Sequence, residues 1–288
     1  MSRIVHVNGL YVPENEAKIS VFDRAFLFGD AVYEVTAVLA GRLVDFQAHL
    51  ERLDRSLKEI ALASPLNRQA LLSLHLELVR RNRVDEGIVY LEITRGAAER
   101  DFAYPEGAAS NVVAFTQSRP LIANPHAETG VKIITIPDLR WKRRDIKSTS
   151  MLAQTMGKQD AKRKGAYEAW MVEDGLVTEG TSSTAFILDD RGVIRTQPLG
   201  PHILPGVTRR AVLRLAALEG VNLEERPFSV AEALSAREAF MTAASALVLP
   251  IVEIDGVPIG DGRPGPIARR FRSLYIEEAR TSSIGEDS

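Results

Sequence analysis

Residues 140–154 read RWKRRDIKSTSMLAQ and place Lys147 directly before a segment with helical character. Ser148 or Thr149 is the expected N-cap of a helix over residues 148–164, because a short hydroxyl side chain accepts a hydrogen bond from a free N–H group of the first turn. A run of charges like the one before the lysine is typical of a solvated surface. The same cations would lower the pKa of a buried lysine amine, which favours a nucleophile. Taken alone, the stretch leaves both interpretations open.

The composition is that of an ordinary globular protein and indicates no macromolecular partner. The 288 residues are 45% hydrophobic and 26% charged, enough for one large domain or two smaller ones. A formal net charge of −2 gives no electrostatic reason to bind nucleic acid or an anionic membrane. The absence of cysteine excludes disulfides and thiolate metal sites, and the five histidines have no metal-ligand spacing. No apolar run approaches the roughly 20 residues that span a bilayer, so we expect a cytoplasmic protein.

Turn and periodicity signals predict a mixture of β-hairpins and helices. The dipeptides NG at residues 8–9, AG at 40–41 and DG at 255–256 each stand between alternating apolar residues, the pattern of a two-residue hairpin turn. In other segments the apolar residues recur at helical spacing. These segments predict helices over about residues 46–63, 68–81, 206–219, 230–235 and 264–280.

The order of these elements predicts two domains. Residues 118–126, SRPLIANPH, carry two prolines and no clear periodicity, which indicates a linker. We therefore expect a small N-terminal α/β domain over residues 1–117 and a larger C-terminal domain over residues 127–280. The tail 281–288 has the composition of a disordered segment. Strands and helices alternate too irregularly for a simple doubly wound sheet, so the expected fold class is mixed α/β.

Two further segments carry candidate functional groups. GLVTEGTSSTAFIL, residues 175–188, predicts two strands around a tight turn at Glu179, whose carboxylate either pairs with a cation or lies exposed. ILPGVTRRAVLRLAALEG, residues 203–220, places a glycine directly before a helix. The first backbone N–H groups of that helix, at Val207 and Thr208, have no helical partner and favour an anion such as phosphate. An ordinary capped helix is the simpler interpretation of this segment.

In this order, IKS, VTEGTSS and ILPGVTR resemble the motifs of the fold-type IV pyridoxal-phosphate enzymes. That family contains D-amino-acid transaminases, branched-chain transaminases, (R)-amine transaminases and aminodeoxychorismate lyases. The resemblance extends over nearly the whole chain, from VNG near the start to the VEIDG hairpin and RPGPIARR near the end. It implies two mixed α/β domains, pyridoxal 5′-phosphate as the cofactor, and a homodimer.

The resemblance also implies roles for individual residues. Lys147 corresponds to the lysine that forms a Schiff base with the cofactor and then moves the substrate proton. Glu179 corresponds to the carboxylate that keeps the pyridine nitrogen protonated by ion pairing. Val207 and Thr208 bind the cofactor phosphate. Arg52, in AHLERLDRS, matches the family's phosphate-binding arginine, and a guanidinium is well suited to a phosphate.

One position departs from the family pattern in the expected phosphate site. The chain reads FMTAASALVLP, so that Ala244 stands where close D-amino-acid transaminases carry a phosphate-contacting threonine. Ser245 is the expected replacement contact, and Thr242 is a second candidate. If neither hydroxyl compensates, the cofactor is expected to dissociate faster than from a relative that has the complete set of hydroxyl groups.

The N-terminal domain carries the substrate signals. FDRAFLFGDAVYEV, residues 22–35, matches the D-amino-acid transaminase branch, in which Tyr33 would face the substrate. TRGAAERDFAYP, residues 94–105, keeps Arg100 but has Phe102 where this branch usually carries a histidine. One guanidinium still binds a carboxylate. The aromatic ring removes a donor, however, so an amine without a carboxylate leaves fewer buried donors unpaired.

The function indicated is therefore transfer of an amino group from a D-amino acid to a 2-oxo acid by a ping-pong mechanism, and (R)-primary amines are further candidate donors. An (R)-selective amine transaminase is the first alternative, followed by a branched-chain aminotransferase or an aminodeoxychorismate lyase. A catalytically idle protein that binds pyridoxal phosphate is disfavoured, because Lys147, Glu179 and Arg52 are all present. A nucleic-acid binder built on RWKRR is disfavoured by the acidic net charge.

Overall fold

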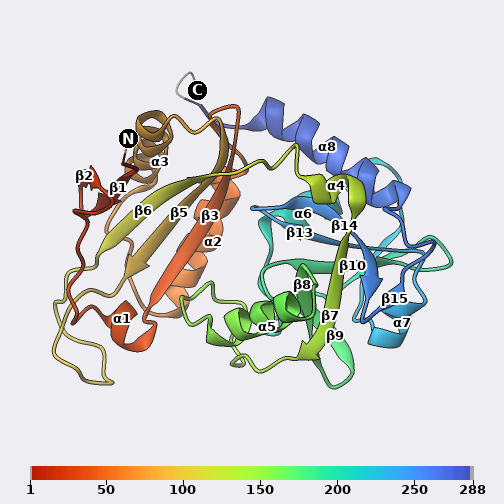
Figure 1. Ribbon diagram of the computed structural model, residues 1–288. Helices are drawn as coiled ribbons and strands as arrows, with labels where there is room; N and C mark the ends of the chain where they lie inside the picture. The colour runs from red at the N-terminus through yellow and green to blue at the C-terminus, as the bar shows by residue number, and fades with distance from the viewer. Residues whose placement is uncertain (1, 286–288) are drawn as a thin grey trace. The chain divides into compact units, whose positions relative to one another are not determined.

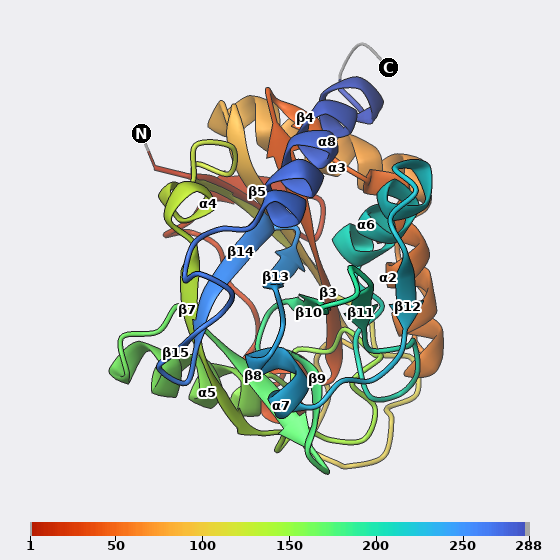
Figure 2. The same ribbon diagram turned by 90° about the vertical axis from the view of Figure 1, so that its right-hand side faces the viewer.

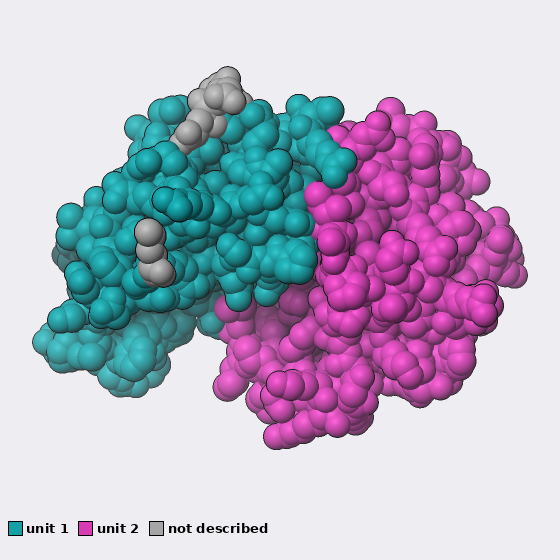
Figure 3. Space-filling view, turned by 45° about the horizontal axis from the view of Figure 1, so that its top comes forward, with its two compact units in different colours: residues 1–121, 146–150, 279–288 teal, residues 122–145, 151–278 magenta. Residues whose placement is uncertain are grey.

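The computed structural model describes residues 2–285 and divides into two compact units (Figure 3). Unit 1 extends to Leu121 and includes residues 146–150 and the chain from Ala279 onward, whereas unit 2 contains residues 122–145 and 151–278. The first crossing falls inside the segment 118–126, and the short helix α4 (Pro125–Thr129) also begins there. The chain returns to unit 1 for five residues, and Lys147 is one of them. Each unit therefore contains separate stretches of the sequence, so the units are not two domains that are continuous in sequence.

Unit 1 is built on an antiparallel sheet. Within residues 2–285 it has six strands in the order β2-β1-β6-β5-β3-β4. The bounds are β1 Ile4–Val7, β2 Leu10–Pro13, β3 Ala31–Leu39, β4 Arg42–Leu43, β5 Glu86–Thr94 and β6 Val112–Ser118. The two expected hairpins are confirmed, and all four turn residues have the positive φ that a two-residue hairpin turn requires. These four residues are Asn8, Gly9, Ala40 and Gly41.

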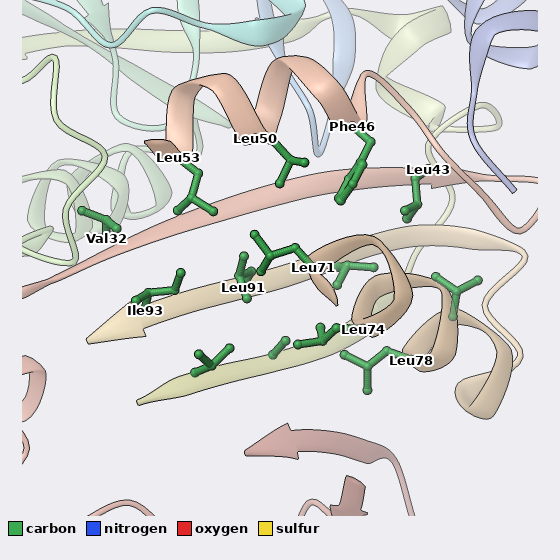
Figure 4. Close-up of a cluster of buried hydrophobic side chains, with 14 of the residues drawn as sticks. Val32, Leu43, Phe46, Leu50, Leu53, Leu71, Leu74, Leu78, Leu91 and Ile93 are labelled. Carbon is green, nitrogen blue, oxygen red and sulfur yellow. The ribbon is translucent and has the colours of Figure 1, made fainter. Parts of the chain in front are cut away.

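Helices α2 (Phe46–Glu59) and α3 (Arg68–Asn82) cover one face of this sheet (Figure 1). Figure 4 shows the core between them, in which Leu53 and Leu78 are fully buried beside Val32 and Leu91. Both helices were expected from their apolar spacing, but α2 ends several residues earlier, because Ala61 has a left-handed φ of 49° and interrupts the helix. A further short helix, α1 (Arg24–Phe28), precedes β3 and is capped by Asp23.

Unit 2 is built on a mixed sheet. Among the described residues it has nine strands, ordered β12-β11-β10-β13-β14-β7-β8-β9, with β15 paired to β14. The bounds are β7 Val131–Pro137, β8 Glu168–Glu173, β9 Leu176–Gly180, β10 Thr184–Leu188, β11 Ile194–Thr196, β12 Leu223–Glu225, β13 Glu238–Ala243, β14 Leu247–Ile254 and β15 Val257–Pro258. Strand β7 pairs in parallel with both β8 and β14, whereas β10 and β13 pair antiparallel. The expected mixed α/β class is confirmed.

Besides α4, the described part of unit 2 contains α5 (Leu152–Arg163), α6 (Val207–Leu218), α7 (Val230–Leu234) and most of α8 (Pro266–Ser282), whose last residues belong to unit 1. Figure 2 shows α8 alongside β14. The Phe271 ring of α8 meets Phe240 of β13 edge to face at 6.2 Å between centroids, and Phe240 stacks on Phe186 of β10 at 4.8 Å. Apolar rings from three elements therefore form one layer of the core.

Two expectations from the sequence differ from the structure at helix ends. The helix after Lys147 begins at Leu152 and not at Ser148 or Thr149, because the backbone of those two residues is paired with the start of β3. At the C-terminus, α8 continues to Ser282 and Ile284 forms a bridge with Leu43, so residues 281–285 are ordered. Residues 286–288 of the expected tail lie outside the described residues.

A buried histidine makes the stability of unit 1 depend on pH. His75 of α3 contacts the Phe46 ring at 4.9 Å between centroids, and its Nδ1 lies 2.7 Å from the Leu71 carbonyl. Burial lowers the pKa of His75 from 6.5 to about 4. Between these values the unfolded chain binds a proton that the folded chain does not. The free energy of unfolding therefore falls as the pH drops through this window, by about 3 kcal/mol from this residue.

Replacing His75 with phenylalanine should reduce this pH dependence, because the ring contact is kept and the titrating group is removed. Urea unfolding of the parent and of H75F at pH 7 and pH 4.5 measures the effect. The buried His49 and His6, whose pKa values are also lowered by burial, keep part of the slope in the variant. An unchanged loss of stability in H75F would contradict the assignment.

Candidate functional site

Lys147 is held beside the first strand residues of β3. The backbone N–H of Tyr33 donates to the Lys147 carbonyl at 3.0 Å, and the Thr149 N–H donates to the Ala31 carbonyl at 3.1 Å. The Lys147 N–H donates to the Ser56 hydroxyl of α2 at 3.3 Å. This backbone pairing directs the lysine side chain to Tyr33, where its Nζ lies 4.2 Å from the centre of the ring. Lysine and tyrosine, 114 positions apart in sequence, are thus neighbours.

The Tyr33 ring belongs to an aromatic row on one face of the unit 1 sheet. It stacks on Tyr90 of β5 at 5.4 Å between centroids, and Tyr90 stacks on Phe115 of β6 at 4.8 Å. Side chains alternate between the two faces of a strand. Val32 and Leu91, which are next to Tyr33 and Tyr90 in sequence, pack against α2 and α3, so the aromatic row lies on the opposite face of the sheet. The Lys147 amine therefore lies on the aromatic face of the sheet.

Arg52 is buried in a network that the sequence did not indicate. Its Nε and Nη2 donate to the two carboxylate oxygens of Glu34, each at 2.8 Å, and the Nδ1 of His49 lies 2.7 Å from Glu34 Oε2. Burial alone would raise the pKa of Glu34, but the Arg52 charge and hydrogen bonds from Arg52 and His49 hold it well below its ordinary value. A planar arginine fork therefore faces a permanently ionised carboxylate.

Removal of one partner from this pair should be costly. We expect Arg52→Met to lower the free energy of unfolding by about 3–5 kcal/mol, because it leaves the Glu34 charge buried without its guanidinium. Arg68→Met is the matched control, since Arg68 pairs with Asp54 at an exposed position and should change stability by less than about 1 kcal/mol. Equal effects of the two substitutions in urea unfolding would contradict this account, and E34Q/R52M should recover part of the loss.

Glu179 is buried at the end of β9 and is not an exposed turn residue. It is 4% exposed, pairs with Arg140 and accepts the Leu204 N–H at 3.1 Å on Oε1. Arg140 also pairs with Asp138, and the Thr178 hydroxyl donates to the same Asp138 carboxylate at 2.7 Å. Burial raises the pKa of Glu179, while the Arg140 charge acts in the opposite direction. Because a buried carboxylate needs a cation beside it, a buried Glu179 implies a cationic partner. That implication was the signal that could have pointed to Arg140.

The other cations of residues 142–144 have carboxylate partners within unit 2. Lys142 pairs with Glu173, and Arg144 donates to the same glutamate at 2.7 Å. Arg143 pairs with Asp145 at 3.1 Å. Their positive charges are therefore balanced locally, so the charge run that precedes Lys147 consists of ion pairs and only Lys142 has a mostly exposed side chain.

The start of α6 has the features of an anion cradle. The N-cap residue of α6 is Gly206, which has no side chain that could accept a hydrogen bond from the helix start. The first amides, those of Val207 and Thr208, are therefore available. A Cβ at Gly206 would lie only 2.7 Å from the Thr184 hydroxyl, so a side chain there would fill the cradle. The hydroxyl groups of Thr208 and Thr242 are buried and have no hydrogen-bond partner within residues 2–285. Unpaired buried hydroxyls beside a helix start fit a phosphate group.

The structure distinguishes the two candidate hydroxyls near Ala244. Thr242 lies on β13 directly opposite Thr184, the residue that borders the Gly206 cradle. Ser245 lies in the turn after β13 and is only half-buried. Thr242 is therefore the candidate hydroxyl residue that is paired with a residue of the Gly206 cradle.

Arg100 and Phe102 lie together in the loop between β5 and β6. The Arg100 guanidinium is 5.4 Å from the Phe102 ring and 5.4 Å from the Phe28 ring. Arg24 holds this loop by donating to the Asp101 carbonyl at 2.6 Å. Phe102 is 78% exposed, and in the described part of the chain the pair contacts Phe28 rather than Tyr33 or Lys147.

Comparison with known proteins identifies the family. The family model described as amino-transferase class IV matches residues 31–254, so the chain belongs to the class IV aminotransferases. It is therefore an aminotransferase, as expected from the motifs around Lys147, Glu179 and Thr208.

Two curated relatives match over nearly the whole length. The chain is 36% identical to a D-alanine aminotransferase of Staphylococcus aureus (strain MSSA476), over 97% of this chain and 99% of that protein. It is 39% identical to a D-alanine aminotransferase of Bacillus licheniformis, over 95% of this chain and 98% of that protein.

Solved structures of branched-chain amino acid aminotransferases share the fold. The branched-chain amino acid aminotransferase of Escherichia coli superposes with a TM-score of 0.89 at 23% identity, covering 97% of this chain and 95% of that one. The branched-chain amino acid aminotransferase of T.th., solved with pyridoxamine 5′-phosphate, gives a TM-score of 0.88 at 26% identity, covering 97% and 94%.

Residues 2–285 contain no candidate metal site and no candidate membrane span. The His, Asp and Glu side chains form no group of three or more that could hold a metal ion. Over the same residues, every helix is too short or too polar to cross a bilayer.

Proposed function

We propose that this aminotransferase takes an amino group from a D-amino acid and passes it to a 2-oxo acid, with pyridoxal 5′-phosphate as its cofactor. The observation that carries the choice of substrate is the near full-length similarity to two curated D-alanine aminotransferases, at 36% and 39% identity. The cradle at the start of α6 supports a cofactor that bears a phosphate. When bound, that cofactor supplies an aldehyde carbon that an amine can attack and an electron-withdrawing pyridine ring.

Each end of the cofactor has a candidate binding group in the chain. The Lys147 amine would hold the aldehyde carbon, and Glu179 would face the pyridine nitrogen as a buried acceptor supported by the Leu204 N–H. The amides of Val207 and Thr208 and the unpaired hydroxyl of Thr208 would hold the phosphate. Arg52 is assigned to the phosphate by the family resemblance alone.

The side chains on the aromatic face of unit 1 are suited to the proton transfer. Once released, Lys147 Nζ would take the proton from the substrate Cα and return it later, as a general base and then an acid. Tyr33 lies 4.2 Å from that nitrogen, so its ring shields one side of the reacting atoms from water. Its hydroxyl can donate to a substrate carboxylate. The amino donor and the 2-oxo acid would occupy the same site one after the other, which gives ping-pong kinetics.

Lys147→Ala should lower kcat for D-alanine and 2-oxoglutarate, measured as pyruvate released, by about 10³-fold or more, because it removes the amine that attacks and moves the proton. Lys142→Ala is the matched control, since Lys142 is 76% exposed in an ion pair and should retain activity within about threefold. Coupled assays of pyridoxal-phosphate-loaded protein measure both. Steady turnover by K147A at more than a tenth of the parent rate would contradict the assignment.

A relaxed substrate range is a second proposal, and it depends on Phe102. The Phe102 ring beside Arg100 offers no hydrogen-bond donor, so the guanidinium alone would bind a carboxylate there and selection for a carboxylate would be weak. We expect (R)-1-phenylethylamine to change the absorbance spectrum of the bound cofactor at a measurable rate that is lower than the rate with D-alanine. The same panel tests the alternatives: conversion by L-leucine alone would support a branched-chain enzyme, and pyruvate release from aminodeoxychorismate would support a lyase.

We also propose that the protein works as a homodimer. Phe22, Phe26 and Phe102 are large apolar side chains of unit 1 that are 49%, 76% and 78% exposed. Large apolar side chains exposed at a surface favour association. Light scattering after size exclusion gives the mass, and a monomer at micromolar concentration would contradict this proposal.

A further inference from the structure

One carboxylate on the aromatic face of unit 1 has no part in the functions assigned so far. Glu92 of β5 is paired directly with Tyr33 of β3 in the antiparallel register. Directly opposite residues point to the same face, with Cβ atoms about 5 Å apart. The Glu92 side chain is therefore the cross-strand neighbour of the Tyr33 ring, and Lys147 Nζ lies 4.2 Å from the centre of that ring.

Within residues 2–285, Glu92 has no cationic partner. Its Oε2 accepts a hydrogen bond from the Tyr90 hydroxyl at 2.7 Å, which fixes the carboxylate against the aromatic row. Two other buried carboxylates of this unit are neutralised, Glu34 by Arg52 and Asp30 by Arg24 and Arg95, whereas the buried Asp23 is held by Thr94 and Asn111. Burial raises the pKa of Glu92, as expected for a carboxylate without a neighbouring cation, while the Tyr90 hydrogen bond lowers it.

We infer that Glu92 is a specificity-determining residue that selects against amino donors and 2-oxo acids with a second carboxylate. The inference rests on the proposed function, because it takes Lys147 as the group that meets the substrate. The α-carboxylate is common to all amino-acid donors, whereas a side-chain carboxylate that approaches the Tyr33 ring adds a second negative charge beside Glu92, in surroundings where charges are poorly screened. Neutral side chains meet only the aromatic row, and cationic side chains gain an ion pair.

The energetic scale of this effect is set by charge repulsion. Two like charges several ångströms apart near a protein surface repel each other enough to change binding about tenfold. The parent enzyme should therefore use D-alanine better than D-glutamate, and pyruvate better than 2-oxoglutarate. A basic donor such as D-ornithine should be used better than D-glutamate by a larger factor.

The test is Glu92→Gln, which keeps the shape of the side chain and an oxygen for the Tyr90 hydroxyl while it removes the charge. With holoenzyme we expect kcat/KM for D-glutamate to rise about tenfold relative to D-alanine, and that for D-ornithine to fall. Glutarate and butyrate, which do not react, give a readout that does not depend on turnover. The dissociation constant of glutarate should fall about tenfold in E92Q, whereas that of butyrate should stay within about threefold.

Glu14→Gln is the matched control, because Glu14 is a carboxylate of the same unit that pairs with Arg3 at an exposed position. It should leave both ratios unchanged. If the parent turns over D-amino acids but E92Q leaves the D-glutamate to D-alanine ratio and the glutarate affinity unchanged, the inference fails and the proposed function stands. If the parent transfers no amino group from any D-amino acid, the proposed function itself fails, and the glutarate measurement still decides on Glu92.

Discussion

The backbone pairing of residues 146–150 with the start of β3 is the constraint on which the candidate chemistry depends. These five residues leave unit 2 in sequence, form a bridge between Ser148 and Val32, and then return. Their hydrogen bonds replace a helix start that the sequence would otherwise allow. As a result, the Lys147 side chain has a fixed origin on a rigid sheet, and its amine lies against the Tyr33 ring instead of moving with a surface loop. A catalytic amine needs such a fixed position, because a displacement of about 1 Å can cost two orders of magnitude in rate.

Buried charge is distributed unevenly around these elements. Glu34 and Glu179 each lie buried with an arginine, so their charges are balanced before any ligand binds. Glu92 is held by a hydroxyl only. Since an uncompensated carboxylate in partly desolvated surroundings destabilises the fold, its presence beside the aromatic row is better explained by a role toward a ligand than by stability.

The sequence predicted the local features well and the long-range pairings poorly. Turns such as 8–9 and 255–256 need a particular backbone conformation that few residue types allow, so their signal is local and they were found. The mixed α/β class and the family motifs were likewise recognised. The partners of Arg52 and Glu179 were not, because Glu34 and Arg140 lie 18 and 39 positions away and no periodicity connects them. The start of α5 was misplaced for the same reason: the competing strand is more than a hundred residues distant.

The role of Lys147 is tested most directly by finding where the cofactor is attached. The holoenzyme would be reduced with borohydride, digested, and its peptides analysed by mass spectrometry. We expect a single pyridoxyl-phosphate adduct on Lys147 among the eight lysines of the chain, and we expect it to be lost when D-alanine is added before the reductant. An adduct on another lysine, or one on Lys147 that D-alanine leaves unchanged, would contradict the account.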